Sequence, residues 1–138
     1  MSMTGVLTLM SIPAGLEFEA RFAHSHMRFD SRRGERDVSP VEGLLASLAA
    51  CEAMDVIDIL RKKRQKVTAY EVLMSGERRP DPPKRFLSIT LVHRVTGVDV
   101  ARAAVEEAVR LSDEKYCTVR HSLAADLVVS HVIEILPA

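Results

Sequence analysis

The chain has 138 residues, a length that is typical of one domain. It carries 19 Lys and Arg against 19 Asp and Glu, so neither nucleic acid nor an anionic membrane is indicated as a partner. No apolar run reaches the ~20 residues that a bilayer span requires, and residues 1–15 lack the basic start and the cleavage site of a secretory signal. We therefore expect a soluble, cytoplasmic protein, a single domain over residues 1–138, whose thiols are reduced by default.

The N-terminal part of the chain predicts strands. Apolar and polar residues alternate over residues 6–9 and 16–22, which is typical of half-buried strands, and a turn is expected between them at residues 13–15. A short third strand is expected at residues 27–29. Residues 31–38 are polar and follow no period, so they predict a loop.

A long helix is predicted over residues 39–66. Ser39 can cap its start, Pro40 suits the first helical position, and Glu42 stands three residues after the Ser, as a capping box requires. Residues 44–51 read LLASLAAC and are apolar or small on every side, which indicates a helix inside a core.

The remaining chain mixes strands and helices. The predicted elements are, in order, strands at residues 67–78 and 86–95, a turn at 96–98, a helix capped by Asp99, a break at 112–116, a short helix at 118–125 and a strand at 127–136. Strands that cluster apart from helices, without a regular βαβ repeat, indicate an α+β fold.

The two cysteines are the first candidates for chemistry, although inert packing is the ordinary role of a buried thiol. Cys117 precedes a predicted helix N-terminus and lies near Lys115 and Arg120, an environment that lowers the pKa of a thiol. Cys51 lies in the middle of the long helix, where burial disfavours the thiolate, and Asp55 one turn later would add a like charge if unpaired. Local electrostatics alone therefore predict that Cys117 is the more reactive thiol.

A metal site has weaker support in the sequence. His24 and His26 lie two residues apart, so on a strand they would share a face and could pair on a metal. No CxxC or HxxxH pair is present to complete a tetrahedral set. The basic residues 61–66 are interpreted as a solvated helix end, because a helix C-terminus favours positive charge.

Several segments of the chain carry a resemblance to a known family. They are SPVEGLLASLAAC and, tens of residues later, KYCTV, and they resemble the OsmC/Ohr superfamily of organic hydroperoxide reductases. The segments CEAMDVIDILRKKRQ, GERRPDPPKRF and LSDEKYCTV are most similar to its YhfA-type OsmC-like branch. The resemblance implies an intertwined homodimer in which antiparallel sheets wrap around two long central helices, with sites at the subunit interface.

The same resemblance implies a thiol peroxidase that needs no metal or organic cofactor. Cys51 would attack an organic hydroperoxide and become a sulfenic acid, and Cys117 would condense with it to a disulfide. An external dithiol would then reduce that disulfide. The family pattern thus inverts the order of reactivity that local electrostatics predict, because it makes Cys51 the nucleophile and Cys117 the resolving thiol.

The family also activates its nucleophile with an Arg from the N-terminal region, held by a Glu at the start of the central helix. Glu42 is the matching Glu, although it stands one residue later than in the Ohr branch, and the capping box gives it a structural role as well. Arg21 is the candidate cation, with Arg28 close behind. The other arginines available are Arg32, Arg33 and Arg36. None of them lies in an Ohr-like glycine-rich loop, and a branch without this Arg would have a slower or different activity.

Two rival functions stay open. One is a non-enzymatic OsmC-like dimer that binds a hydrophobic ligand or partner, with structural cysteines. The other is a metal-binding dimer that uses thiols and histidines. If the enzyme is right, the apolar neighbours Leu44, Leu48 and Met54 along the helix of Cys51 would favour a fatty or aromatic peroxide over hydrogen peroxide.

Overall fold

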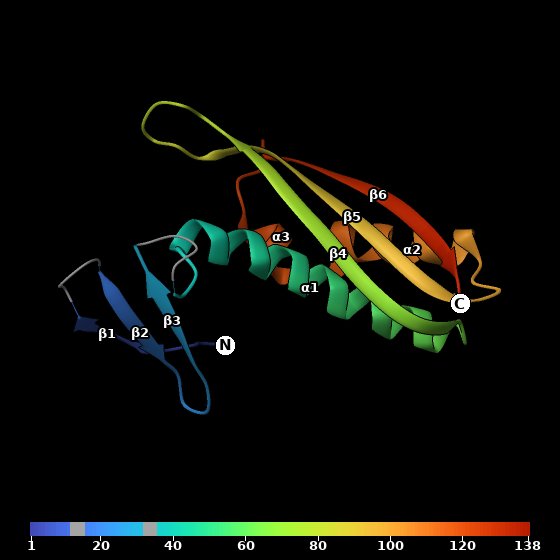
Figure 1. Ribbon diagram of the computed structural model, residues 1–138, viewed down its shortest axis with the longest axis horizontal. Helices are drawn as coiled ribbons and strands as arrows, with labels where there is room; N and C mark the ends of the chain where they lie inside the picture. Colours follow the sequence, from blue (N-terminus) through green and yellow to red (C-terminus); the bar gives the residue numbers. More distant parts are fainter. Residues whose placement is uncertain (12–15, 32–35) are drawn as a thin grey trace. The chain divides into compact units, whose positions relative to one another are not determined.

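The computed structural model describes residues 1–11, 16–31 and 36–138, so the turn predicted at residues 13–15 and the candidates Arg32 and Arg33 lie outside the described residues. The elements, in chain order, are β1 (Val6–Ser11), β2 (Glu17–Arg21), β3 (His26–Asp30), α1 (Pro40–Lys62), β4 (Lys66–Arg78), β5 (Phe86–Val98), α2 (Arg102–Leu111), a π-helical turn η1 (Ser112–Tyr116), α3 (Thr118–Ser122) and β6 (Val128–Pro137) (Figure 1). Mixed strands and helices in this order confirm the α+β class.

The chain divides into two compact units, Met1–Leu44 and Leu45–Ala138, which we describe separately. Among the helices of the described residues, none combines the length and the apolar character that a membrane crossing requires.

In the first unit, β1, β2 and β3 form an antiparallel three-stranded sheet in that order. The period-two alternation predicted this sheet, but its polar face is not uniformly exposed to solvent, because Glu19 is buried. Phe29 at the end of β3 packs its ring against Gly43 in the first turn of α1, where a Cβ atom would lie 3.0 Å from the ring. A larger residue at position 43 would therefore require the Phe29 ring to shift.

In the second unit, β4, β5 and β6 form a sheet in that order, with β4 antiparallel and β6 parallel to β5. The expectation of antiparallel sheets therefore holds for every described pair except β5 and β6. The chain leaves β5, passes through α2, η1 and α3, and returns to start β6 beside the beginning of β5, which makes that pair parallel.

Helices α1 and α2 pack on one face of this sheet (Figure 1). A first core cluster joins Val56 and Leu60 of α1 to Val95 of β5 and to the apolar stripe of α2. A second cluster joins Leu48 of α1 to Leu91 of β5 and to the segment around α3. The second cluster contains the candidate site.

Several predicted boundaries were wrong. The helix α1 ends at Lys62, since Arg64 adopts a positive φ of 57°. The turn predicted at residues 96–98 belongs instead to β5, and the chain reverses at Asp99, whose φ is 50°. Asp99 consequently does not cap α2; the cap position is Ala101, which has no side-chain acceptor. The break predicted at residues 112–116 is the π-helical turn η1, which continues α2.

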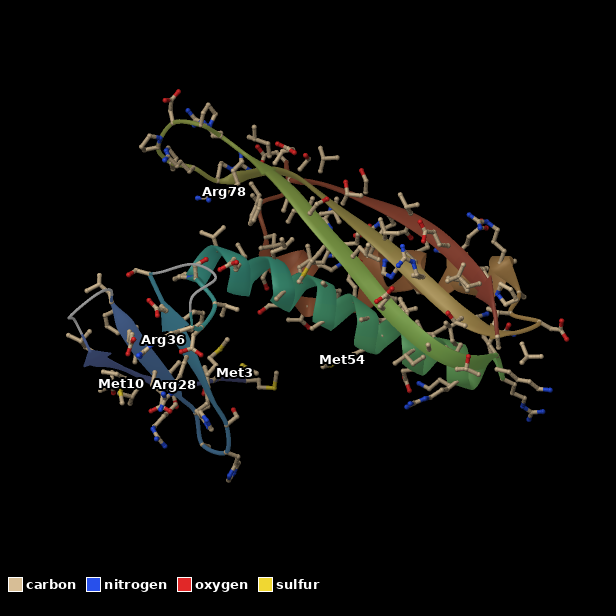
Figure 2. All side chains as sticks on the ribbon, viewed as in Figure 1. Met3, Met10, Arg28, Arg36, Met54 and Arg78 are labelled. Atoms are coloured by element: carbon tan, nitrogen blue, oxygen red, sulfur yellow. The ribbon has the colours of Figure 1, made fainter. Side chains whose placement is uncertain are left out.

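Within the single chain, α1 is covered on one side only. Leu48, Val56 and Leu60 are fully buried against the sheet, whereas Met54 is 70% exposed. Figure 2 shows Met54 projecting from the side of α1 that faces away from the β4–β5–β6 sheet. One sheet covers only one side of a helix.

Candidate functional site

The two cysteines, remote in the sequence, lie together in the second unit. Cys51 belongs to the middle of α1, and Cys117 is the N-cap residue of α3. Both are free thiols, and both belong to the second core cluster. The Cys51 side chain is close enough to hydrogen-bond with the Cys117 thiol. A disulfide between them therefore requires only a local rearrangement.

Burial dominates the environment of Cys117. Its side chain has no exposed surface, and this burial raises the pKa of the Cys117 thiol to about 12. The backbone N–H of Arg120 donates to its Sγ at 3.2 Å and opposes that shift, but the hydrogen bond that the Cys117 thiol donates to Cys51 and the charges of Cys51 and Glu52 add to it. The prediction that local cations make Cys117 the reactive thiol was therefore wrong.

The cations predicted to activate Cys117 do not reach it. The guanidinium of Arg120 donates from Nε to Asp113 Oδ1 at 2.9 Å, and the ammonium of Lys115 lies over the ring of Tyr116. The helix that Cys117 caps has only five residues, so its dipole is short. Since neither a cation nor a long helix dipole favours its thiolate, Cys117 is a protonated thiol beside Cys51.

The π-helical turn positions Cys117. The Cys117 N–H donates to the carbonyl of Ser112 at 2.9 Å, which closes the turn. The hydroxyl of Ser112, itself buried, donates to Asp55 Oδ2 at 2.8 Å and ties the turn to α1. Asp55 is thus engaged by a donor and is not the unpaired like charge that the sequence allowed.

Beside the thiols lies a buried polar cluster that the sequence analysis did not predict. Glu52, the neighbour of Cys51, has no exposed surface, and its Oε1 lies 3.0 Å from Nε2 of His131 on β6. Its Oε2 has no hydrogen-bond partner among the described residues. The available signal was the single carboxylate in the apolar run of residues 44–54, since such a group has to find a partner when it is buried.

Two further residues extend this cluster across the sheet. His93 on β5 stacks on His131 with ring centroids 5.6 Å apart, and its Nδ1 lies 2.7 Å from the hydroxyl of Tyr70 on β4. Burial, and secondarily the charge of His131, lower the pKa of His93 to about 4. His93 is therefore neutral at physiological pH. Burial and the charge of Glu52 raise the pKa of Tyr70.

Three oxygen and nitrogen atoms of this region lie within 4.8 Å of one another, and they belong to Glu52, Asp113 and His131. Within residues 1–11, 16–31 and 36–138 this is the one group with three such donors. Each donor already has a protein partner, because Arg120 binds Asp113 while His131 and Glu52 bind each other. We interpret the group as a hydrogen-bonded network.

The histidines considered for a metal lie in the first unit and are exposed. His24 lies in the bend between β2 and β3, whereas His26 is the first residue of β3, so they do not share a strand face as predicted.

The residues predicted to activate the nucleophile also lie in the first unit. Glu42 and Ser39 form the predicted capping box: Ser39 N–H donates to Glu42 Oε1 at 3.0 Å, and Glu42 N–H donates to Ser39 Oγ at 3.2 Å. Arg21 donates from Nε to Glu19 at 3.1 Å, and Arg28 lies 3.8 Å from the same carboxylate. Arg36 pairs with Glu17 at 2.6 Å. The capping role of Glu42 is confirmed, and its catalytic role stays a prediction.

Comparison with known proteins identifies the family. Residues 33–132 match the family described as OsmC-like protein. Protein YhfA of Escherichia coli strain K12 is 40% identical over 125 residues, which cover 90% of this chain and 93% of that protein. A hypothetical protein of Aquifex aeolicus has a similar structure, with a TM-score of 0.87 and 29% identity over 100% of this chain and 98% of that one.

A more distant structure shares the fold. The organic hydroperoxide resistance protein OhrB of Bacillus subtilis has a TM-score of 0.63 at 17% identity, over 95% of this chain and 98% of that one. The family match and the identity with YhfA together confirm the resemblance found in the motifs. The chain belongs to the OsmC-like protein family.

Proposed function

We propose that this protein is a cysteine-based reductase of organic hydroperoxides. Cys51 attacks the terminal peroxide oxygen, so that the O–O bond breaks, an alcohol leaves and Cys51 becomes a sulfenic acid. Cys117 then displaces the sulfenic hydroxyl, which leaves as water, and a Cys51–Cys117 disulfide forms. An external dithiol returns both thiols by exchange. No metal or organic cofactor takes part.

The observation that carries the proposal is the contact between Cys51 and Cys117 inside an apolar cluster. A pair of free thiols this close is suited to form and break one disulfide. The distribution of roles follows from burial: Cys117 keeps its proton, with a pKa raised by burial to about 12, so Cys51 is the thiol that attacks first. Leu48, which is buried in the same cluster, favours an apolar peroxide.

Arg21 and Glu42 complete the proposed machinery. Arg21 binds Glu19 through Nε, and a guanidinium has five N–H donors, so it keeps donors for a second anion. Glu42 would hold this Arg from the start of α1, as in the family pattern. The fold of the family further suggests a homodimer as the active form.

The decisive experiment counts thiols and locates the disulfide. The reduced protein is mixed with one equivalent of cumene hydroperoxide, and free thiols and peptide masses are measured. We expect two thiols lost per chain and a Cys51–Cys117 disulfide within one chain. In Cys117→Ser the reaction should stop at a Cys51 sulfenic acid that dimedone traps. Hydrogen peroxide, tested in parallel, should react more slowly.

The rival function is a non-enzymatic module that binds a hydrophobic ligand, with cysteines that only pack. Both thiols would then survive the hydroperoxide, and Cys51→Ser would leave every measurable property unchanged. Retention of both thiols in the folded protein therefore rejects the enzyme.

A further inference from the structure

The resolving step poses a problem of proton transfer. Cys117 has to lose its thiol proton as it attacks the Cys51 sulfenic acid, yet the thiol has no exposed surface. With a pKa raised by burial to about 12, it is a thiolate in only about one molecule in 10⁵ at neutral pH. Solvent hydroxide reaches the sulfur only when the site opens transiently. A buried base beside it would remove this obstacle.

Glu52 is such a base. It follows Cys51 on α1, it is fully buried, and its charge acts on Cys117. Its Oε1 is held by His131, while its Oε2 has no hydrogen-bond partner among the described residues. A buried carboxylate oxygen without a donor is costly, and it is suited to accept a proton.

We propose that Glu52, positioned by His131, accepts the thiol proton of Cys117 during disulfide formation and delivers it to the departing sulfenic hydroxyl. The S–H bond of Cys117 and the S–O bond of Cys51 break, and the S–S bond forms. The proton passes through Glu52 to the hydroxyl, which leaves as water, so Glu52 ends in its original state. This assignment rests on the proposed function, which supplies the sulfenic acid.

The groups around Glu52 fit this role. From the sheet, His131 holds Oε1, and behind it stand His93 and Tyr70, a neutral pair at physiological pH. From η1, Asp113 Oδ1 lies 3.8 Å from His131 Nε2 and is itself neutralised by Arg120. Asp113 and Arg120 also line a cavity of about 220 Å³, through which the far end of the network can exchange protons with solvent.

Two effects of removing the charge at Glu52 have opposite signs, which makes the proposal testable. The negative charge of Glu52 raises the pKa of Cys117, so as a mere charge it slows resolution, and Glu52→Gln would accelerate it. As a proton acceptor it speeds resolution, and Glu52→Gln would slow it. General base catalysis contributes about 10²-fold or more, which exceeds the charge effect.

The experiment follows the two steps separately in the full-length protein. Rapid mixing with cumene hydroperoxide, acid quench and mass spectrometry give the rate of Cys51 sulfenic acid formation and the rate of disulfide formation at pH 5–10. In Glu52→Gln we expect disulfide formation to slow roughly 100-fold at pH 7, with sulfenic acid formation within about threefold. The rate should also rise with pH across the whole range, since only hydroxide then removes the proton.

Glu52→Asp retains a carboxylate and serves as the conservative variant, which should keep the wild-type shape of the pH profile at a lower rate. Glu114→Gln, at an exposed position of η1, is the matched control and should leave both rates unchanged.

Resolution in Glu52→Gln at or above the wild-type rate overturns the inference and leaves the proposed function intact. Absence of sulfenic acid in the wild type instead rejects the proposed function. Should Glu52→Gln fail to fold, a rate in Glu52→Asp that rises with pH like an uncatalysed one overturns the inference.

Discussion

The Cys117 sulfur is shut off from solvent, whereas Cys51 is half-buried, and this difference separates the two thiols. Because burial raises the pKa of Cys117 to about 12, its thiolate fraction at pH 8 is roughly 10⁻⁴. We expect iodoacetamide to label Cys51 and to spare Cys117 in the reduced native protein at pH 8. Peptide mass spectrometry measures the two extents. Full labelling of both in guanidinium chloride is the control, and faster labelling of Cys117 would contradict the assigned roles.

Arg21 can be tested against other arginines of the same unit. If it stabilises the charge that develops at Cys51 and the peroxide, Arg21→Gln should slow sulfenic acid formation roughly 100-fold, the usual effect of removing one preorganised donor. Arg36→Gln, at an exposed arginine paired with Glu17, is the matched control and should react normally. A slow Arg28→Gln beside a normal Arg21→Gln would move the role to Arg28, and normal rates in all three variants would exclude these three arginines.

His93 predicts how stability responds to acid. Its pKa is lowered from 6.5 to about 4 in the folded protein, chiefly by burial, so the unfolded chain binds the proton more readily. The contribution is complete above about pH 6.5 and is lost as the pH falls toward 4, in total about 3 kcal/mol. Denaturant titrations at fixed protein concentration should show this slope in the wild type and in the exposed control His121→Gln. His93→Gln, which removes the titrating ring, should flatten it.

At the level of residues, the sequence could predict the thiol pair but not its surroundings. Cys51 and Cys117 follow from the family motifs. The buried polar cluster could not be predicted in this way. Its members lie on a helix and two strands that meet only after folding, and the sequence spacing of Glu52, His93 and His131 does not predict their contact. The failed expectation for Cys117 has the same cause: sequence neighbours supplied cations, but folding directed Arg120 to Asp113 and buried the thiol.

The start of α1 is the element whose local signals were most complete. Ser39→Ala removes the side-chain acceptor of the capping box and should lower the free energy of unfolding by about 1 kcal/mol. Glu42→Gln retains an acceptor for the Ser39 N–H and should cost less than about 0.5 kcal/mol. Denaturant unfolding of both variants tests this pair, and an equal loss in the two would contradict it. Because Glu42→Gln keeps the cap, slower oxidation of Cys51 in this variant would establish a separate chemical role for Glu42.

Other element boundaries could not be predicted, because they depend on tertiary contacts. The strand β5 continues through residues 96–98 because β4 and β6 pair with it on both sides, which overrides the turn preference of Gly97. The π-helical turn lies where the Ser112 hydroxyl donates to Asp55, and this contact joins two segments 57 residues apart, which a local pattern does not relate. A parallel β6 likewise follows from the return path of the chain.

At the scale of the whole molecule, α1 has an exposed apolar side that a single chain does not bury. The sequence predicts a helix apolar on every side, yet one chain leaves Met54 70% exposed (Figure 2). An apolar side chain in the middle of a long helix is the usual content of an interface core. The family pattern of an intertwined homodimer would bury this side against a second copy. Sheet topology within one chain cannot reveal that partner.

We therefore expect the protein to sediment as a dimer at micromolar concentration. Met54→Glu places a charge where the second copy would pack, and burying an unpaired charge costs several kcal/mol, so this variant should sediment as a monomer. Val98→Glu, at an apolar residue that is 47% exposed at the end of β5, is the control for an added carboxylate and should remain dimeric. Circular dichroism of both variants checks that each still folds. A wild-type protein that sediments as a monomer, or a Met54→Glu protein that stays dimeric, would show that this side of α1 is not the interface.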